Sequence, residues 1–304
     1  MKEKMNLSSI KRLLGLFGIF TFFVIMEVGV IGCTSFRSYK QDAENLCSTK
    51  DVAGLPVAQS NELEGRHYPL TGEIITTEHL FGLPEIVQRY LKETGVVGQT
   101  MVSTVQLRQT GKIRTAPDAP WMKVKAVETY NIELSEFLWY ADVKMNPFVW
   151  LAGYDRFQDG HGVMKIKMYD LFSVVDASGP SIDQGGMIRY LNELMWLPMG
   201  YLHPSVSWGH GNEKSVEVSI TINEMTVSGI IDFNNDALPI NFTAKRFMDD
   251  GKGRSSLETW MVPIDSWREY HGVILPEHGY ASWMLEDGEF QYIELTVEDV
   301  EFGV

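Results

Sequence analysis

The sequence predicts a mainly β protein of the α+β kind, built on one large, curved antiparallel sheet. Beyond residue 76, apolar and polar residues alternate with a period of two in many short segments, as in Ser215–Ile222. Such alternation indicates strands with one buried and one solvated face, which is typical of antiparallel sheets. Turn residues such as Asp159-Gly160 separate these segments. Helical segments do not alternate with them, so a parallel nucleotide-binding sheet is excluded.

The alternating segments predict about 10–12 strands once neighbouring candidates are joined. Their periodicity fixes which side chains share a face, because successive side chains of a strand point to opposite sides of the sheet. In chain order the candidates are residues 101–109, 122–126, 129–134, 137–144, 148–157, 164–168, 171–176, 215–222, 225–233, 240–248, 256–263, 267–275, 279–285 and 294–298.

Two segments predict helices. In the first, at residues 83–95, Pro84 suits the first turn and Gly95 the C-terminal cap. The second, about residues 182–197, begins after Ser181 and stops at Pro198. A long antiparallel sheet twists and curls, and its inner face needs cover. We therefore expect two or three helices over the concave face of a half barrel; a closed barrel or a β-sandwich with helical insertions is the alternative.

The N-terminal segment resembles a secretory signal. Basic residues in 1–12 precede an apolar run over 13–32, which ends at Val30-Ile31-Gly32-Cys33. This ending is similar to the lipobox of bacterial lipoproteins, in which the cysteine is lipidated, and it makes Cys33 the candidate lipidation site. The alternatives are an uncleaved membrane anchor over about 20 residues and a disulfide between Cys33 and Cys47. The lipoprotein signal and the uncleaved anchor both predict an extracytoplasmic, membrane-anchored protein of the cell envelope.

Three regions follow from this reading. Residues 1–32 are the signal or anchor, and residues 33–75 are polar and lack a sustained period, which predicts a tether. Residues 76–304 form a single antiparallel β domain. Which membrane holds the anchor is left open.

The composition narrows the classes of partner. The chain carries 26 Lys and Arg against 40 Asp and Glu, a net charge of −14, so it repels phosphate backbones and a nucleic-acid partner is excluded. Only two cysteines occur, which leaves no disulfide framework and no thiolate zinc site. The standard motifs for nucleotide, zinc-protease and serine-hydrolase chemistry are absent, so no cofactor is predicted.

Several blocks of sequence resemble a widespread family of bacterial envelope proteins that is known only as a domain of unknown function. The likeness covers about residues 80–302. It implies no established activity, and it implies a fold similar to that of the periplasmic lipoprotein carriers and their outer-membrane receptor. The blocks that carry it are residues 83–96, 137–143, 154–180 and 185–198, with Trp208, the strand around Arg246, Tyr270-x-Gly272-x3-Pro276 and Trp283.

The second helix supplies the candidate polar site. Arg189 and Glu193 stand four residues apart, beside Tyr190 and Trp196. On a helix over the concave face, Arg189 is able to hold an anionic headgroup through two hydrogen bonds. The alternative is a structural ion pair that joins the helix to the sheet.

Aromatic residues supply the candidate apolar site. Large aromatics in a curved sheet can line an apolar groove, and plain core packing is the alternative. Trp139 and Trp283 join Trp196 as the tryptophans of the candidate ligand site. All eight lie in the predicted β region, at 121, 139, 150, 196, 208, 260, 267 and 283.

A metal site is the less favoured reading of Asp155, Asp159 and His161. Carboxylates and an imidazole this close can bind a metal. On a strand, however, the two aspartates stand about 13 Å apart, and Asp159-Gly160 predicts a hairpin turn. No metal ligand is therefore assigned. The remaining candidate histidines fit ordinary surface or core positions: His203, His210, His271 and His278.

The sequence thus predicts a membrane-tethered protein that binds a hydrophobic or amphiphilic ligand, such as a lipid, an acyl chain or a lipoprotein, without catalysis. The expected mechanism is the desolvation of apolar surface inside the half barrel. A metal-dependent hydrolase of the envelope and a structural or assembly factor are the alternatives. The oligomeric state is left open.

Overall fold

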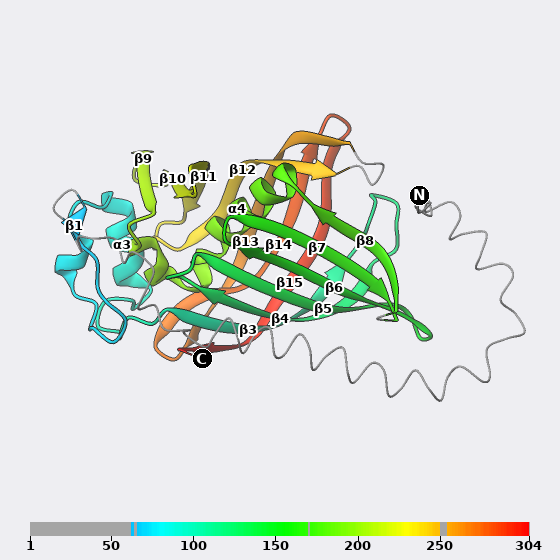
Figure 1. Cartoon of the computed structure of the whole chain (residues 1–304). Helices are drawn as coiled ribbons and strands as arrows, with labels where there is room; N and C mark the ends of the chain where they lie inside the picture. The colour runs from blue at the N-terminus through cyan, green and yellow to red at the C-terminus, as the bar shows by residue number, and fades with distance from the viewer. Residues whose placement is uncertain (1–61, 64–65, 170, 250–253, 304) are drawn as a thin grey trace, which may run out of the picture. The chain divides into compact units, whose positions relative to one another are not determined.

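The computed structural model describes residues 62–63, 66–169, 171–249 and 254–303 (Figure 1). The predicted signal or anchor, Cys33, Cys47 and most of the predicted tether lie outside the described residues. The described residues belong to one compact unit. Among the described residues, no helix has the length and apolar character needed to cross a membrane.

Thirteen strands of the described chain form one antiparallel sheet, which confirms the predicted fold class. Their order in space is β8-β7-β6-β5-β4-β3-β15-β14-β13-β12-β11-β10-β9. The strands are β3 (Thr104–Ile113), β4 (Met122–Asn131), β5 (Glu136–Asn146), β6 (Val149–Gln158), β7 (His161–Met168), β8 (Phe172–Ser178), β9 (Val206–Gly211), β10 (Ser215–Ile222), β11 (Met225–Phe233), β12 (Pro239–Asp249), β13 (Ser255–Tyr270), β14 (Val273–Leu285) and β15 (Gly288–Phe302). A separate pair is β1 (Glu62–Leu63) with β2 (Arg66–His67).

The chain builds this sheet in two halves. Strands β3 to β8 follow one another from the centre of the sheet to one edge. Strands β9 to β15 follow one another from the other edge to the centre, where β15 pairs with β3. At this central ladder a Cβ added to Gly111 would clash with the backbone carbonyl of Glu294. The close approach of two backbones requires glycine at this position.

The connection between the halves is α4 (Pro180–Glu193), which lies across the concave face (Figure 1). The helix contacts β6, β7 and β8 of one half and β11 and β12 of the other. Since these strands lie far apart in the sheet order, the sheet curls around the helix. This arrangement is the predicted half barrel with a helix in its mouth.

The α-helix ends earlier than the sequence predicts. It begins at Pro180, which suits a first helical position, and ends at Glu193 instead of Leu197. Two 3-10 helices follow, η2 (Leu194–Trp196) and η3 (Pro198–Leu202). Pro198 therefore does not end the α-helix, as the sequence predicted, but begins η3.

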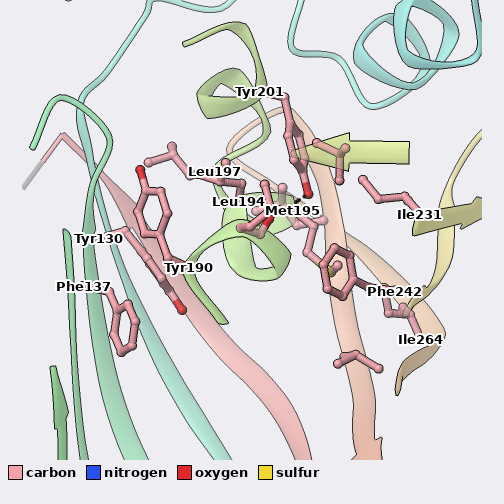
Figure 2. Packing of buried hydrophobic residues seen from close by; sticks show 14 of the residues in the cluster. Tyr130, Phe137, Tyr190, Leu194, Met195, Leu197, Tyr201, Ile231, Phe242 and Ile264 are labelled. Atoms are coloured by element: carbon pink, nitrogen blue, oxygen red, sulfur yellow. Dashed lines mark hydrogen bonds between the residues drawn. The ribbon is translucent and has the colours of Figure 1, made fainter. Parts of the chain in front are cut away.

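The core fills the space between the two halves of the sheet (Figure 2). Side chains of α4, η2 and η3 stand between those of β4 and β5 on one side and those of β11, β12 and β13 on the other. Phe157 and Tyr190 stack with their ring centroids 6.4 Å apart. The residues labelled in Figure 2 are Tyr130, Phe137, Tyr190, Leu194, Met195, Leu197, Tyr201, Ile231, Phe242 and Ile264.

The first predicted helix is α3 (Glu85–Glu93), which buries Ile86, Val87, Tyr90 and Leu91. Before it, the 3-10 helix η1 (Thr77–Leu80) buries Leu80. The last residues of the predicted tether pack on the domain, because Ile75 is buried and Ile74 pairs with Thr100.

Several strand boundaries differ from the sequence prediction, and β9 was not among the candidates. The candidates 122–126 and 129–134 join into β4, which ends at Asn131. The candidate 267–275 is instead divided by a turn, in which His271 and Gly272 both have a positive φ. Two consecutive positive φ angles are typical of a tight hairpin turn. A signal for this turn was present in the sequence, because His271-Gly272 stand between the apolar residues Tyr270 and Val273.

Candidate functional site

The predicted polar site is an ion cluster at the centre of the half barrel. The guanidinium of Arg189, on α4, donates to Glu128 Oε1 and to Asp155 Oδ2, both at 2.6 Å. Its Nε donates to both carboxylate oxygens of Glu193 at 3.0 Å. Glu128 stands on β4 and Asp155 on β6, so the cluster joins the helix to two strands. These contacts are the structural alternative that the sequence left open for Arg189.

Neutral polar groups complete the cluster. Tyr130 donates to Glu193 Oε2 at 2.6 Å, and Gln109 donates to Glu128 Oε2 at 3.0 Å. Trp139 in turn donates through Nε1 to the side-chain oxygen of Gln109. The ring of Trp139 lies 5.1 Å from the guanidinium carbon of Arg189, within the range of a cation–π contact.

The electrostatics of the cluster follow from its burial. Arg189 has a 12% exposed side chain and faces three carboxylates, two of which, Glu128 and Glu193, are almost completely buried. Burial, followed by repulsion from Glu193, raises the pKa of Glu128. Burial likewise raises the pKa of Glu193 against the opposing effect of Arg189. Burial therefore disfavours the charge of these two carboxylates, and Arg189 offsets this effect by pairing with all three acidic groups.

The structure brings together only part of the predicted ligand site. Arg189, Glu193 and Trp139 meet in the cluster, whereas the ring of Tyr190 stacks on Phe157 in the core. Trp196 donates through Nε1 to the carbonyl of Pro276, outside the cluster.

The sixth predicted residue, Trp283, stacks on Tyr292 with the ring centroids 6.0 Å apart. It lies near the guanidinium of Arg246, at 5.8 Å, and takes no part in the Arg189 cluster. The ligand-binding role of the six residues stays a prediction.

The predicted apolar space on the concave face is occupied by the side chains of α4, η2 and η3 (Figure 2). A depression of about 500 Å³ lies instead over β9 to β13, where Glu217, Ile230, Thr243 and Lys245 line it. These side chains alternate with the buried Ala244 and Phe242, so they face away from the core. The depression is therefore on the convex face.

The alternative metal residues have separate partners. Asp155 pairs with Arg189, and Asp159 occupies the hairpin turn with a φ of 53°, as predicted. His161 is exposed, and its Nδ1 lies 3.4 Å from Asp183 Oδ2. The residues therefore do not converge on one ion.

An exposed apolar surface lies at one end of the sheet, and we call it the apolar tip. Its five side chains come from the end of β5, the start of β8 and the two turns that join β5 to β6 and β7 to β8, strands that Figure 1 shows side by side. Tyr169 joins the two turns by donating to the carbonyl of Phe148 at 3.1 Å and by packing edge-on against Trp150. The exposed fractions are Met145 49%, Phe148 81%, Leu171 48%, Phe172 60% and Val174 37%.

Lysines flank the apolar tip on the convex face. In the row of cross-strand neighbours closest to the turns, Lys144 on β5 stands between Lys123 on β4 and Trp150 on β6. On the next rung, Lys125 stands opposite Asp142, and Lys167 follows on β7. Cross-strand neighbours lie about 5 Å apart, so four lysines and one aspartate share this surface. It is locally cationic on a chain whose net charge is −14.

The apolar tip was not predicted from the sequence. A signal for it was present, since Phe148 directly follows Pro147, and Leu171 and Phe172 stand close after the turn residue Tyr169. Large apolar residues at turns have no sheet face on which to be buried. The aromatic residues of the strands were instead predicted to line a groove.

The protein family of this chain follows from a match to a family model over most of the fold. A model described as a family of unknown function (DUF6544) matches residues 73–295. The chain belongs to this family. DUF6544 thus covers the sheet from β3 to β15, α4 with its ion cluster, and the apolar tip. This confirms the resemblance to a domain of unknown function. No curated protein is similar in sequence to this member of DUF6544.

The chain is also similar to solved structures of low sequence identity. A putative outer membrane lipoprotein-sorting protein domain from Vibrio parahaemolyticus is 9% identical, with a TM-score of 0.36 over 72% of this chain and 91% of its own. A DUF1329 family protein from Desulfovibrio piger is 8% identical, with a TM-score of 0.41 over 72% and 91%. A LolA superfamily protein from Nitrosomonas europaea is 8% identical, with a TM-score of 0.35 over 71% and 92%. Likenesses at this level do not establish a shared function.

Proposed function

We propose that this protein is an extracytoplasmic, membrane-attached protein that binds lipid without catalysis, and that it does so by inserting the apolar tip into an anionic bilayer surface. The exposure of five large apolar side chains in and beside two adjacent turns is the observation that carries the proposal. Thirteen large apolar side chains are exposed in the described part of the chain, and five of them gather here. Contiguous exposed apolar surface is typical of a protein or membrane contact.

A bilayer fits the shape of the apolar tip better than an enclosed acyl chain or a lipoprotein tail does. Phe148 and Phe172 project from turns, whereas pockets for small hydrophobic ligands are concave and bury most of the ligand. Burying one Phe side chain contributes about 1.5–3 kcal/mol. Two such residues are therefore sufficient for measurable binding to a membrane surface.

Charge complementarity favours an anionic bilayer. A lysine close to an anionic membrane contributes about 1 kcal/mol, and Lys123 and Lys144 stand on the rung next to the turns. The rest of the chain is acidic, so this end is the one that an anionic surface attracts. Together with the predicted N-terminal lipid or anchor, the apolar tip supplies a second attachment point, and two weak signals are needed for stable anchoring.

Vesicle binding tests the proposal. The core cluster consists of residues between Ile75 and Val300, so a chain of residues 42–304 retains the whole core and lacks the predicted anchor. We expect this chain to co-sediment with vesicles that contain anionic phospholipid. The substitutions Phe148→Ser and Phe172→Ser should each weaken binding by about tenfold or more, given the free energy of burying one Phe.

Phe81→Ser is the matched control, because Phe81 is 74% exposed and stands at the end of η1, away from the apolar tip. It should leave vesicle binding unchanged. Thermal unfolding of every variant checks that the fold is intact. Equal binding by the Phe148→Ser variant and the unsubstituted chain would contradict the proposal, and so would a complete lack of binding to anionic vesicles.

A further inference from the structure

Three residues near the start of the described domain offer metal ligands to one point. His67, Glu73 and His79 each place one imidazole nitrogen or carboxylate oxygen within 4.8 Å of the others. The imidazole rings of His67 and His79 stack with centroids 5.4 Å apart, and His67 Nε2 lies 3.9 Å from Glu73 Oε2. The three stand at equal intervals in the sequence, as His-x5-Glu-x5-His.

The backbone that carries these side chains is held by the domain. Glu73 accepts a backbone hydrogen bond from Met101 at 2.7 Å, and its carboxylate accepts the N–H of Leu70 at 2.9 Å. His79 belongs to η1, which buries Leu80 in the core. His67 is the last residue of β2, the element that precedes η1 in the chain.

The chemistry of the three groups is suited to zinc. Two imidazoles and one carboxylate form a donor set that binds Zn²⁺ in proteins and leaves a fourth position for water. Nδ1 of His79 accepts the N–H of Thr76 at 2.9 Å, which requires a lone pair on that nitrogen. This contact favours the neutral imidazole, which is the form that binds a metal.

We propose that His67, Glu73 and His79 form a binding site for a divalent transition-metal ion of the zinc type, and that the bound ion fastens β2 to η1. The ligand atoms are farther apart than a bound ion allows, since Zn–N and Zn–O distances are about 2.0–2.2 Å. The exposed side chains of His67 and Glu73 close this gap by small rotations, and the ion takes the place of the Thr76 N–H at His79. The site is separate from the apolar tip.

Titration with Zn²⁺ tests the site. The probe is ZnCl₂, added to the tag-free full chain in detergent, with Cys33→Ser and Cys47→Ser removing the thiols. Calorimetry should show one Zn²⁺ per chain. The substitutions His67→Ala and His79→Ala should each weaken affinity by about 100-fold or more, because even the loss of an outer-shell partner lowers metal affinity by about 10–100-fold.

His161→Ala is the matched control, since His161 is also an exposed imidazole beside a carboxylate, Asp183. It should leave the affinity for Zn²⁺ unchanged. Thermal unfolding in a chelator checks the fold of each variant. Unchanged affinity in both the His67→Ala and the His79→Ala chain would overturn the site, and so would an equal loss in the His161→Ala chain.

Limited trypsin digestion tests the fastening of β2. The peptide bond after Arg66 adjoins His67, so a bound ion should slow cleavage there. Zn²⁺ should slow this cleavage in the parent chain, and it should have no effect in the His79→Ala chain, whose cleavage site is intact. Cleavage that Zn²⁺ leaves unchanged in the parent chain would overturn this part of the proposal.

Discussion

Arg189 on α4 donates to Glu128 on β4 across 2.6 Å, and the carboxylate is completely buried. The same guanidinium binds Asp155 and Glu193, so one cation compensates three carboxyl groups. Removing one partner of a buried ion pair leaves uncompensated charge, which costs about 3–5 kcal/mol. We therefore expect Arg189→Met to lower the free energy of unfolding by about that amount in a denaturant titration.

The matched control for this change is Arg108→Met. Arg108 also forms a salt bridge at 2.8 Å, with Glu301, but its side chain is 58% exposed. Exposed pairs contribute about 0–1 kcal/mol. If the two substitutions destabilise the protein equally, the cluster does not stabilise the contact between helix and sheet.

Buried carboxyls predict that the protein becomes less stable as the pH rises. Burial, followed by repulsion from Asp159, raises the pKa of Glu136 to about 7, and burial also raises the pKa of Glu128 and Glu193. A raised pKa means that folding favours the protonated form. The stability from these groups is thus fully present below their ordinary pKa of 4.5 and is lost as the pH rises through the raised values. Thermal unfolding should show a falling Tm from about pH 5 to about pH 8.

Glu136→Gln isolates one part of this dependence. Oε2 of Glu136 is buried and lacks a hydrogen-bond partner among the described residues, so a neutral amide of equal size suits the position. The variant should unfold at a higher temperature than the parent above pH 7 and at a similar temperature near pH 5. The reverse order, or a constant difference at every pH, would show that Glu136 is ionised in the folded protein.

A separate loss of stability at acidic pH is expected from His203. Burial lowers its pKa to about 4, so folding favours the neutral ring. The stability from His203 is present above the ordinary pKa of 6.5 and is lost as the pH falls through about 4. His203→Gln should therefore lose less stability than the parent between about pH 6 and pH 4, measured by denaturant titration at each pH. An identical acid profile would contradict this assignment.

Gly111 predicts a steric effect at the centre of the sheet. A Cβ at this position would clash with the backbone carbonyl of Glu294, and a backbone carbonyl cannot turn away as a flexible side chain does. Gly111→Ala should destabilise the protein by about 1–3 kcal/mol, the range of overpacking. Gly153→Ala is the control, since its nearest neighbour, an atom of the Trp139 ring, is at an ordinary 3.5 Å. Equal effects would show that β3 and β15 adjust freely.

Local patterns were sufficient to predict most of the fold. The alternation in residues 215–222 and 225–233 gave β10 and β11 with their correct ends, because each strand has one wet and one buried face. The turn at His271-Gly272 was missed, although Gly272 is a turn residue that stands between two apolar positions. The order of the strands depends on which edges meet, and that information is not local.

The sites were harder to predict than the fold. Arg189 and Glu193 were found together because they stand one helical turn apart, but Glu128 and Asp155 reach them only through the curl of the sheet. The sequence of a helix does not reveal whether a ligand or a neighbouring strand accepts the hydrogen bonds of its arginine. The apolar tip depends on two hairpin turns lying side by side, a relationship that pairing of β6 with β7 creates.

A fluorophore at Phe148 tests the central claim most directly. The chain of residues 42–304 with Cys47→Ser and Phe148→Cys is labelled with an environment-sensitive dye and mixed with anionic phospholipid vesicles. We predict a blue shift and protection from an aqueous quencher, because position 148 enters the bilayer. The same dye at Phe81→Cys, which is also on an exposed phenylalanine, should remain quenchable. A dye at position 148 that remains as quenchable with vesicles as without them would contradict the account.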